Sequence, residues 1–183
     1  MRTDLKKSFI ATIGAQTTLV HFLDVVHGGK ATVSSSLFSG GHYTGRPQSR
    51  DDSHFLSLRP EPRATLYFRY TNNGYRLYIR TPGPYFGKCL SLSENGILGA
   101  FPSEGSNTFN LRDERGYTLS IDTVKSNTLD VYLQVSGLPG ALHIHRLHDS
   151  KFTYFANKGG SPFMFNFTIV ERNAPYLNFP DEV

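Results

Sequence analysis

The chain has 183 residues, of which 38% are hydrophobic and 19% are charged, and its net charge is +4 at pH 7. The shortage of charged residues and the abundance of Gly, Pro, Phe and Tyr argue against a helical bundle. No apolar stretch approaches the length of a membrane-spanning helix, and the positive charge is too small to indicate nucleic-acid binding by itself. The composition therefore predicts a single all-β domain over residues 1–183.

The N-terminal residues start with charges but lack the apolar segment of a secretory signal. The single cysteine, Cys89, excludes an internal disulfide, which fits a reducing compartment. We interpret Cys89 as a small structural residue. These features predict a cytoplasmic location, and release without a signal peptide stays open.

The first third of the chain gives weak signals. Residues 17–26 are the best helical candidate, and strand candidates cover residues 8–13, 30–34, 54–58 and 64–70. The segment Ser34–Ser53 is rich in Ser and Gly, and we expect a long loop there. A loop of this length is either a mobile insertion or a functional element.

A repeat of 42 residues follows, because Gly74 corresponds to Gly116 and Leu77 corresponds to Leu119. In each copy a short apolar strand precedes the glycine and an alternating strand follows it. Phe165-Asn166-Phe167 echoes the start of the second copy, Phe109-Asn110-Leu111. The repeat divides the chain into units of roughly residues 8–74, 75–116 and 117–172, with a tail over residues 173–183.

The middle unit contains four short strand candidates. The last unit contains five, at residues 117–121, 131–135, 141–147, 151–156 and 163–170, so its central hairpin is not fixed by the pattern. Three units of four strands resemble a β-trefoil, in which paired strands close a six-stranded barrel and three hairpins cap it. A β-sandwich is the alternative fold.

Three elements in residues 75–116 carry the resemblance: Lys-x-Leu-x-Leu, Asn-Gly-x-Leu-Gly-Ala and Phe-x-Leu. They are similar to the fascin-like and fungal-lectin branches of the β-trefoil superfamily. The chain has no Trp, so the Gln-x-Trp signature of the ricin-type lectins is absent.

The resemblance implies a lectin-like protein that binds glycans or glycoproteins. No catalytic motif is present, and we predict neither enzymatic activity nor a cofactor. Polar and aromatic loop residues are the candidates for carbohydrate binding: Asn95, Asp122, Asn127, His143, His145, Tyr154 and Asn157.

His143 and His145 lie two residues apart, on one face of a predicted strand. Such a pair can bind Zn²⁺ or Cu²⁺ if His148, Asp149 or another chain supplies a third ligand. The favoured interpretation is a polar outer face with Leu142 and Ile144 pointing inward, so we predict no metal site.

Alternation around Gly74 predicts that Leu66, Phe68, Leu77 and Ile79 face inward. The opposite side is basic and aromatic and forms an alternative site for sulfated glycans or nucleic acid: Tyr67, Arg69, Arg76, Tyr78 and Arg80. A further alternative is an inhibitor, cytokine-like or cytoskeletal module that binds a protein through residues 34–53. The oligomeric state is not predicted.

Overall fold

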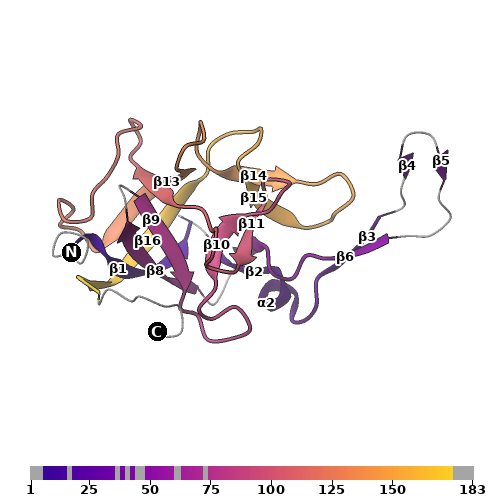
Figure 1. Ribbon diagram of the computed structural model, residues 1–183, viewed down its shortest axis with the longest axis horizontal. Helices are drawn as coiled ribbons and strands as arrows, with labels where there is room; N and C mark the ends of the chain where they lie inside the picture. Colours follow the sequence, from indigo (N-terminus) through magenta and orange to yellow (C-terminus); the bar gives the residue numbers. More distant parts are fainter. Residues whose placement is uncertain are drawn as a thin grey trace.

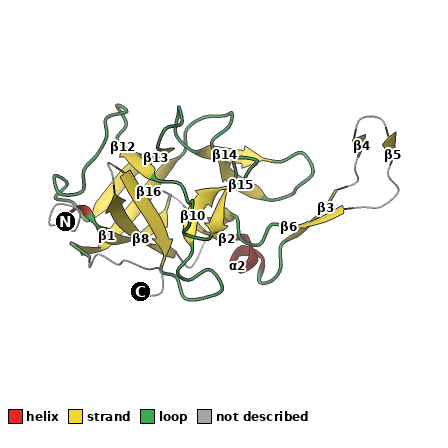
Figure 2. Ribbon diagram, viewed as in Figure 1, coloured by secondary structure: helices red, strands yellow, loops and turns green. Residues whose placement is uncertain are grey.

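The computed structural model describes residues 6–15, 18–35, 38–39, 42–43, 48–59, 63–71 and 74–174, and it is all-β (Figures 1 and 2). Six antiparallel strands form a closed barrel in the order β1–β8–β9–β12–β13–β16, with β16 pairing back onto β1. The strands are β1 (Phe9–Gly14), β8 (Ala64–Thr71), β9 (Gly74–Ile79), β12 (Phe109–Arg112), β13 (Thr128–Val135) and β16 (Met164–Arg172). The all-β prediction is confirmed, and the alternative of a sandwich is wrong because the six strands close on themselves.

Three of the strand pairs outside the barrel lie next to one another. They are β2 (Leu19–Phe22) with β7 (Leu56–Arg59), β10 (Cys89–Leu92) with β11 (Leu98–Phe101), and β14 (His143–Arg146) with β15 (Thr153–Ala156). Isolated bridges link them, Phe55 to Gly99 and Ile97 to Ala156. The three pairs therefore meet at one end of the barrel.

The barrel strands and the outer pairs alternate along the chain. Strands β1, β2, β7 and β8 form one group, β9 to β12 a second, and β13 to β16 a third. In each group the first and last strands enter the barrel and the middle two form the outer pair.

The predicted match between Leu77 and Leu119 does not correspond to the strand pairing. Phe68 pairs with Leu77, and in the next barrel hairpin Leu111 pairs with Leu133. Residues 113–127 connect β12 to β13, and within them only Thr118 makes a β-bridge, with Arg112. The expected strand at residues 117–121 is wrong because a tight turn after β12 imitates the hairpin turn at Gly74.

Large aromatic side chains fill the barrel. The four residues predicted to face inward around Gly74 are completely buried: Leu66, Phe68, Leu77 and Ile79. The Phe68 ring stacks on Phe9 with centroids 4.3 Å apart and contacts Phe167 at 5.0 Å. Residues from β8, β1 and β16 thus share one core, which stabilises the closed barrel through buried apolar surface.

A second apolar cluster lies under the outer strand pairs. It joins Leu23, Phe55, Ile97, Phe152 and Tyr154, which come from all three groups of strands. The outer pairs therefore hold one another through a core of their own.

The first group carries an insertion between β2 and β7. Helix α2 (Leu23–His27) follows β2 directly. The helix expected over residues 17–26 is therefore strand in its first part and helix only from Leu23, and residue 17 lies outside the described residues. No helix in the described part of the chain is long and apolar enough to cross a membrane.

After α2, β3 (Thr32–Ser35) pairs with β6 (Gln48–Asp51), and β4 (Phe38–Ser39) pairs with β5 (His42–Tyr43). We call β3 to β6 the arm, and Figure 1 shows it projecting away from the barrel. The long loop expected over residues 34–53 is therefore partly strand, although residues 36–37, 40–41 and 44–47 lie outside the described residues.

Gly99 tests the contact between the outer pairs. A Cβ atom at this position would lie 2.8 Å from Phe55 Cδ1 and 2.9 Å from the His54 carbonyl oxygen. We expect Gly99→Ala to lower the free energy of unfolding by about 1–3 kcal/mol, measured by urea titration, because the backbone of residue 54 must move. Gly29→Ala is the matched control, since no atom lies within 4 Å of its added Cβ. An unchanged stability of Gly99→Ala would contradict this packing.

Candidate functional site

A groove of about 610 Å³ lies on the outside of the β12–β13 hairpin. Its floor is made by Arg112, Tyr132 and Gln134. One wall is the turn at residues 113–116, and the other is formed by Gly140, Ala141 and Pro162. This volume falls within the range of small-molecule binding sites.

Strand alternation places the floor residues. Leu111 and Leu133 form an inward-facing pair and are completely buried. Their neighbours Arg112 and Tyr132 form the next pair along the ladder and face the opposite side. Gln134 is on this same outer side, two residues after Tyr132.

Hydrogen bonds fix the Arg112 side chain across the floor. Its Nε donates to Gln134 Oε1 at 2.7 Å, and its Nη1 donates to Thr118 Oγ1 at 2.7 Å and to the Gly116 carbonyl at 3.2 Å. Gln134 Nε2 in turn donates to the Leu138 carbonyl at 2.9 Å. The guanidinium and the amide are therefore held in place before any ligand arrives, which lowers the entropy cost of binding.

The acidic turn beside the floor is also ordered. Asp113 Oδ1 accepts hydrogen bonds from the backbone N–H groups of Arg115, at 2.9 Å, and Tyr117, at 2.8 Å. Gly116 has a φ of 82°, a left-handed conformation that side chains disfavour. Glu114 and Arg115 are exposed at the rim of the groove.

The groove thus offers planar hydrogen-bonding groups, a tyrosine and a balanced set of charges. Arg112 and Arg115 oppose Asp113 and Glu114, so the lining has no net formal charge. Planar polar side chains suit hydroxyl groups, and a tyrosine ring suits the apolar face of a sugar ring. Sequence reasoning missed this site, although the alternation of residues 128–135 marks Tyr132 and Gln134 as outward-facing.

The corresponding place on the β8–β9 hairpin is the predicted basic-aromatic face. Aligning Phe68 and Leu77 with Leu111 and Leu133 puts the cross-strand pair Arg69–Arg76 where the groove has Arg112 and Tyr132.

The two tyrosines of that face are buried rather than exposed. Tyr67 is 1% exposed and Tyr78 is 4% exposed, and Ala174 and Cys89 pack with them in one apolar cluster. The prediction that these rings are available to a ligand is therefore wrong, because they pack with Cys89 and with Ala174, which lies just after β16. Arg69, Arg76 and Arg80 remain half-buried, and Arg69 Nη1 donates to the Tyr78 hydroxyl at 3.3 Å.

Cys89 is completely buried in the same cluster. Burial raises the pKa of its thiol to about 11, so the thiol stays protonated at neutral pH.

Two of the predicted carbohydrate-binding residues are buried. His143 is 4% exposed, whereas Ile144 is 38% exposed, so the expected orientation of these two residues is reversed. The reason is that Leu142 precedes β14 and bonds to the Leu133 carbonyl of β13, so the alternation begins anew at His143. Tyr154 is completely buried, and its prediction as a ligand contact is wrong.

The other predicted carbohydrate-binding residues lie in separate places. Asn95 is exposed in the β10–β11 turn, and Asn157 is near it because its N–H donates to the Gly96 carbonyl at 3.1 Å. Asp122 and Asn127 are exposed in the connection before β13. His145 is half-buried, with its ring 6.4 Å from that of His143. None of these residues lines the groove.

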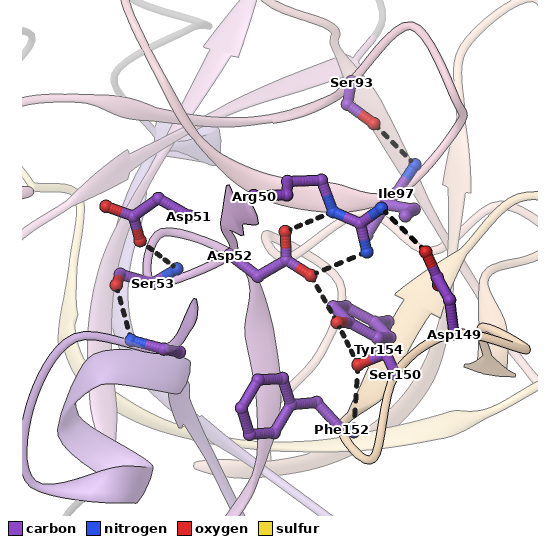
Figure 3. Close-up of polar contacts among 11 residues, drawn as sticks. Arg50, Asp51, Asp52, Ser53, Ser93, Ile97, Asp149, Ser150, Phe152 and Tyr154 are labelled. Atoms are coloured by element: carbon purple, nitrogen blue, oxygen red, sulfur yellow. Dashed lines mark hydrogen bonds and ion pairs between the residues drawn. The ribbon is translucent and has the colours of Figure 1, made fainter. Parts of the chain in front are cut away.

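Tyr154 belongs to a polar cluster at the base of the arm, which we call the clamp (Figure 3). Asp52 follows β6 directly and is completely buried. Its carboxylate receives two hydrogen bonds from Arg50, at 2.6 and 3.1 Å, and one from the Tyr154 hydroxyl. Burial raises the pKa of Tyr154, as does its bond to Asp52, so this hydroxyl remains a donor.

The clamp joins the arm to the β14–β15 turn. Ser150 Oγ lies 2.6 Å from the Tyr154 hydroxyl, and Arg50 Nη1 lies 3.5 Å from Asp149 Oδ2. Hydrogen bonding to Asp52 raises the pKa of Arg50, which keeps the guanidinium charged. A buried carboxylate needs such partners, because without them its desolvation would strongly destabilise the fold.

No group of three or more potential metal ligands of the His, Cys, Asp and Glu types occurs among the described residues. The chain matches no protein-family model, no curated protein and no solved structure.

Removing the Tyr154 hydroxyl tests the clamp. We expect Tyr154→Phe to lower the free energy of unfolding by about 1–3 kcal/mol, because Asp52 Oδ2 loses a buried donor while the ring volume is kept. Urea titration followed by far-UV circular dichroism measures the change. Tyr117→Phe is the control, since Tyr117 is 68% exposed. Equal stability of the two variants would show that the clamp contributes nothing.

Proposed function

We propose that this chain is a non-enzymatic carbohydrate-binding protein of the β-trefoil type, and that the groove on the β12–β13 hairpin holds a neutral oligosaccharide. Two features support the fold assignment. Three successive groups each give two strands to one closed barrel, and the outer strand pairs meet at one end of it. Shallow surface sites on such a barrel suit sugars.

The observation that carries the proposal is the ordered floor of the groove. Arg112 and Gln134 are held by hydrogen bonds to each other and to the surrounding backbone, directly beside Tyr132. Such a floor presents donors and acceptors to sugar hydroxyls in fixed positions. The half-exposed Tyr132 ring supplies the apolar contact that a sugar face needs.

The equal numbers of positive and negative residues in the groove favour neutral over acidic sugars. Two arginines and two carboxylates share the lining, so an acidic sugar gains no net attraction there. Binding of a neutral oligosaccharide is accordingly expected to persist at high salt, whereas binding to an anionic glycan through arginines would fall steeply.

A glycan array with neutral and sulfated sugars, read at low and high salt, tests the proposal. We expect salt-resistant binding to a neutral glycan by the wild-type chain. Tyr132→Ala and Gln134→Ala are each expected to lower affinity about tenfold or more, because each removes contact groups without touching the barrel core.

Tyr117→Ala is the matched control for this experiment. It removes an exposed tyrosine from the connection between β12 and β13, and this tyrosine does not line the groove. We expect this variant to bind as the wild-type chain does. A silent array would overturn the carbohydrate proposal, and unchanged binding by Tyr132→Ala would remove the groove as the site.

A second candidate function is docking of a protein through the arm, and the clamp favours it. The clamp fixes the base of the arm to the β14–β15 turn, while β4 and β5 lie far from the barrel (Figure 1). Between Ala31 and Arg50 the sequence carries a single charged residue, Arg46. An exposed strand edge can pair with a strand of another chain, and proteins commonly prevent this with charged side chains. This part of the arm has almost no charged side chains to prevent such pairing.

Shortening the arm separates the two functions. Val33 and Arg50 are strand partners, so a short Gly-Ser link in place of residues 34–49 keeps the clamp residues. In an extract of the cells that make this protein, cross-linking would capture partner proteins on the wild-type chain. We expect the shortened chain to capture none of these partners, because it lacks the exposed strand edges of the arm. Tyr132→Ala is expected to keep those proteins. Capture of the same proteins by the shortened chain would contradict arm docking.

A further inference from the structure

His143 lies directly behind one wall of the groove. It begins β14, pairs with Ala156 of β15, and forms an isolated bridge with Pro162. Pro162 and Ala141 both line the groove. The side chain is 4% exposed, so it is part of the interior that supports this wall.

The surroundings of His143 suit a neutral imidazole. The hydrogen bond from the ring to the backbone of Ala141 favours protonation, but the Nε2 atom is buried without a hydrogen-bond partner, which disfavours it. The backbone at residue 160 lies close over the ring, because a Cβ on Gly160 would be 3.3 Å from His143 Cδ2. Little room is left for water to solvate a charged ring.

No carboxylate is placed to balance a proton on His143. The neighbouring titratable group is His145, whose ring centroid lies 6.4 Å away and whose charge opposes protonation. The connection at residues 137–142, strand β15 and residues 159–163 carry no charged residue, and Lys158 is exposed and positive. These three segments therefore leave an added charge on the ring uncompensated.

We propose that His143 is a positioning residue that couples proton uptake to the Ala141–Pro162 wall, so that the groove loses its ligand in acid. Neutral His143 supports the wall from behind. A protonated ring must reach water, and Ala141 moves with it because the ring is hydrogen-bonded to its backbone. Pro162 moves as well, because it lies opposite His143 in a β-bridge held by the bond from the Phe163 N–H to the Leu142 carbonyl at 2.8 Å. The loss of affinity rests on the proposed function, whereas the movement of the wall does not.

The direction of the pH effect follows from the environment. Burial lowers the pKa of His143 below the ordinary value of 6.5, and this effect outweighs the hydrogen bond to the Ala141 backbone, which raises the pKa. The nearby His145 lowers the pKa further. The folded groove is therefore intact above about pH 6.5. Stability of the wall is lost as the pH falls through the lowered pKa, because the unfolded or opened state binds the proton more tightly.

A titration of the ligand-free chain by NMR from about pH 8 to about pH 5 tests the coupling. We expect the amide signals of Gly140 and Ala141 to shift with the same midpoint as the His143 ring, and that midpoint to lie below 6.5. His143→Gln is expected to abolish the shift. His145→Gln is the matched control. We expect the Gly140 and Ala141 signals to shift in this variant as well, with a higher midpoint, because His145 lowers the pKa of His143.

The neutral glycan array, read at both ends of this pH range, provides the second readout. Signals that fall in acid for the wild-type chain but not for His143→Gln support the full proposal. Wall amides that titrate with His143 beside a silent array support the coupling and overturn the carbohydrate function. Wall amides that do not follow the His143 ring overturn the coupling, whatever the array shows, and this result needs only the wild-type chain.

Discussion

Each strand of the barrel takes one neighbour from its own group of four strands and the other from the adjacent group. Strand β8 pairs with β1 of its own group and with β9 of the next, and β16 likewise joins β13 to β1. No group can satisfy the backbone of its barrel strands alone, because an isolated group leaves two open edges. Closure therefore depends on all three groups at once. The aromatic core joins Phe9 and Phe68 of the first group to Tyr75 of the second and Phe167 of the third.

Closure of the barrel requires apolar side chains at the inward positions of its strands. The side chains at the outward positions are free to differ between the three groups. The aligned outer pairs are Arg69 with Arg76, Arg112 with Tyr132, and Thr168 with Thr12. One pair borders a covered apolar cluster, and one forms the floor of the open groove. In the third, Thr168 accepts a hydrogen bond from Arg63 at 3.0 Å. The same strand geometry thus produces one open groove among three related surfaces.

Strand alternation in the sequence predicts which side chains face the barrel core. It does not predict which outward-facing side chains are buried by segments far away in the chain. Leu66 and Leu77 face inward as expected, because period-two alternation is a local property of a strand. The burial of Tyr67 depends on Ala174, more than a hundred residues later, and the burial of Tyr154 depends on Asp52, at a similar separation. No local pattern reports such contacts.

The match between Gly74 and Gly116 predicts a strand at residues 117–121, and this prediction is wrong for a different reason. The turn after Arg112 is built by Asp113 accepting backbone hydrogen bonds, and it returns the chain to Thr118 for one bridge only. Its residues look like the turn of a barrel hairpin. The strand that completes the hairpin begins at Thr128 instead, and this choice places Tyr132 and Gln134 in the groove.

The β14–β15 hairpin serves two sites, and its packing keeps them apart. His143 is at one end, behind the groove wall, and pairs with Ala156. His145 pairs with Tyr154, whose ring is fixed in the core under the outer strand pairs and whose hydroxyl is held by Asp52 and Ser150. Opening the hairpin beyond His145 would break the clamp and expose that core, at a cost of several kcal/mol. A proton on His143 therefore has its effect at the near end of the hairpin, where Ala141 is only partly buried and Pro162 is exposed, and the base of the arm stays where the clamp holds it.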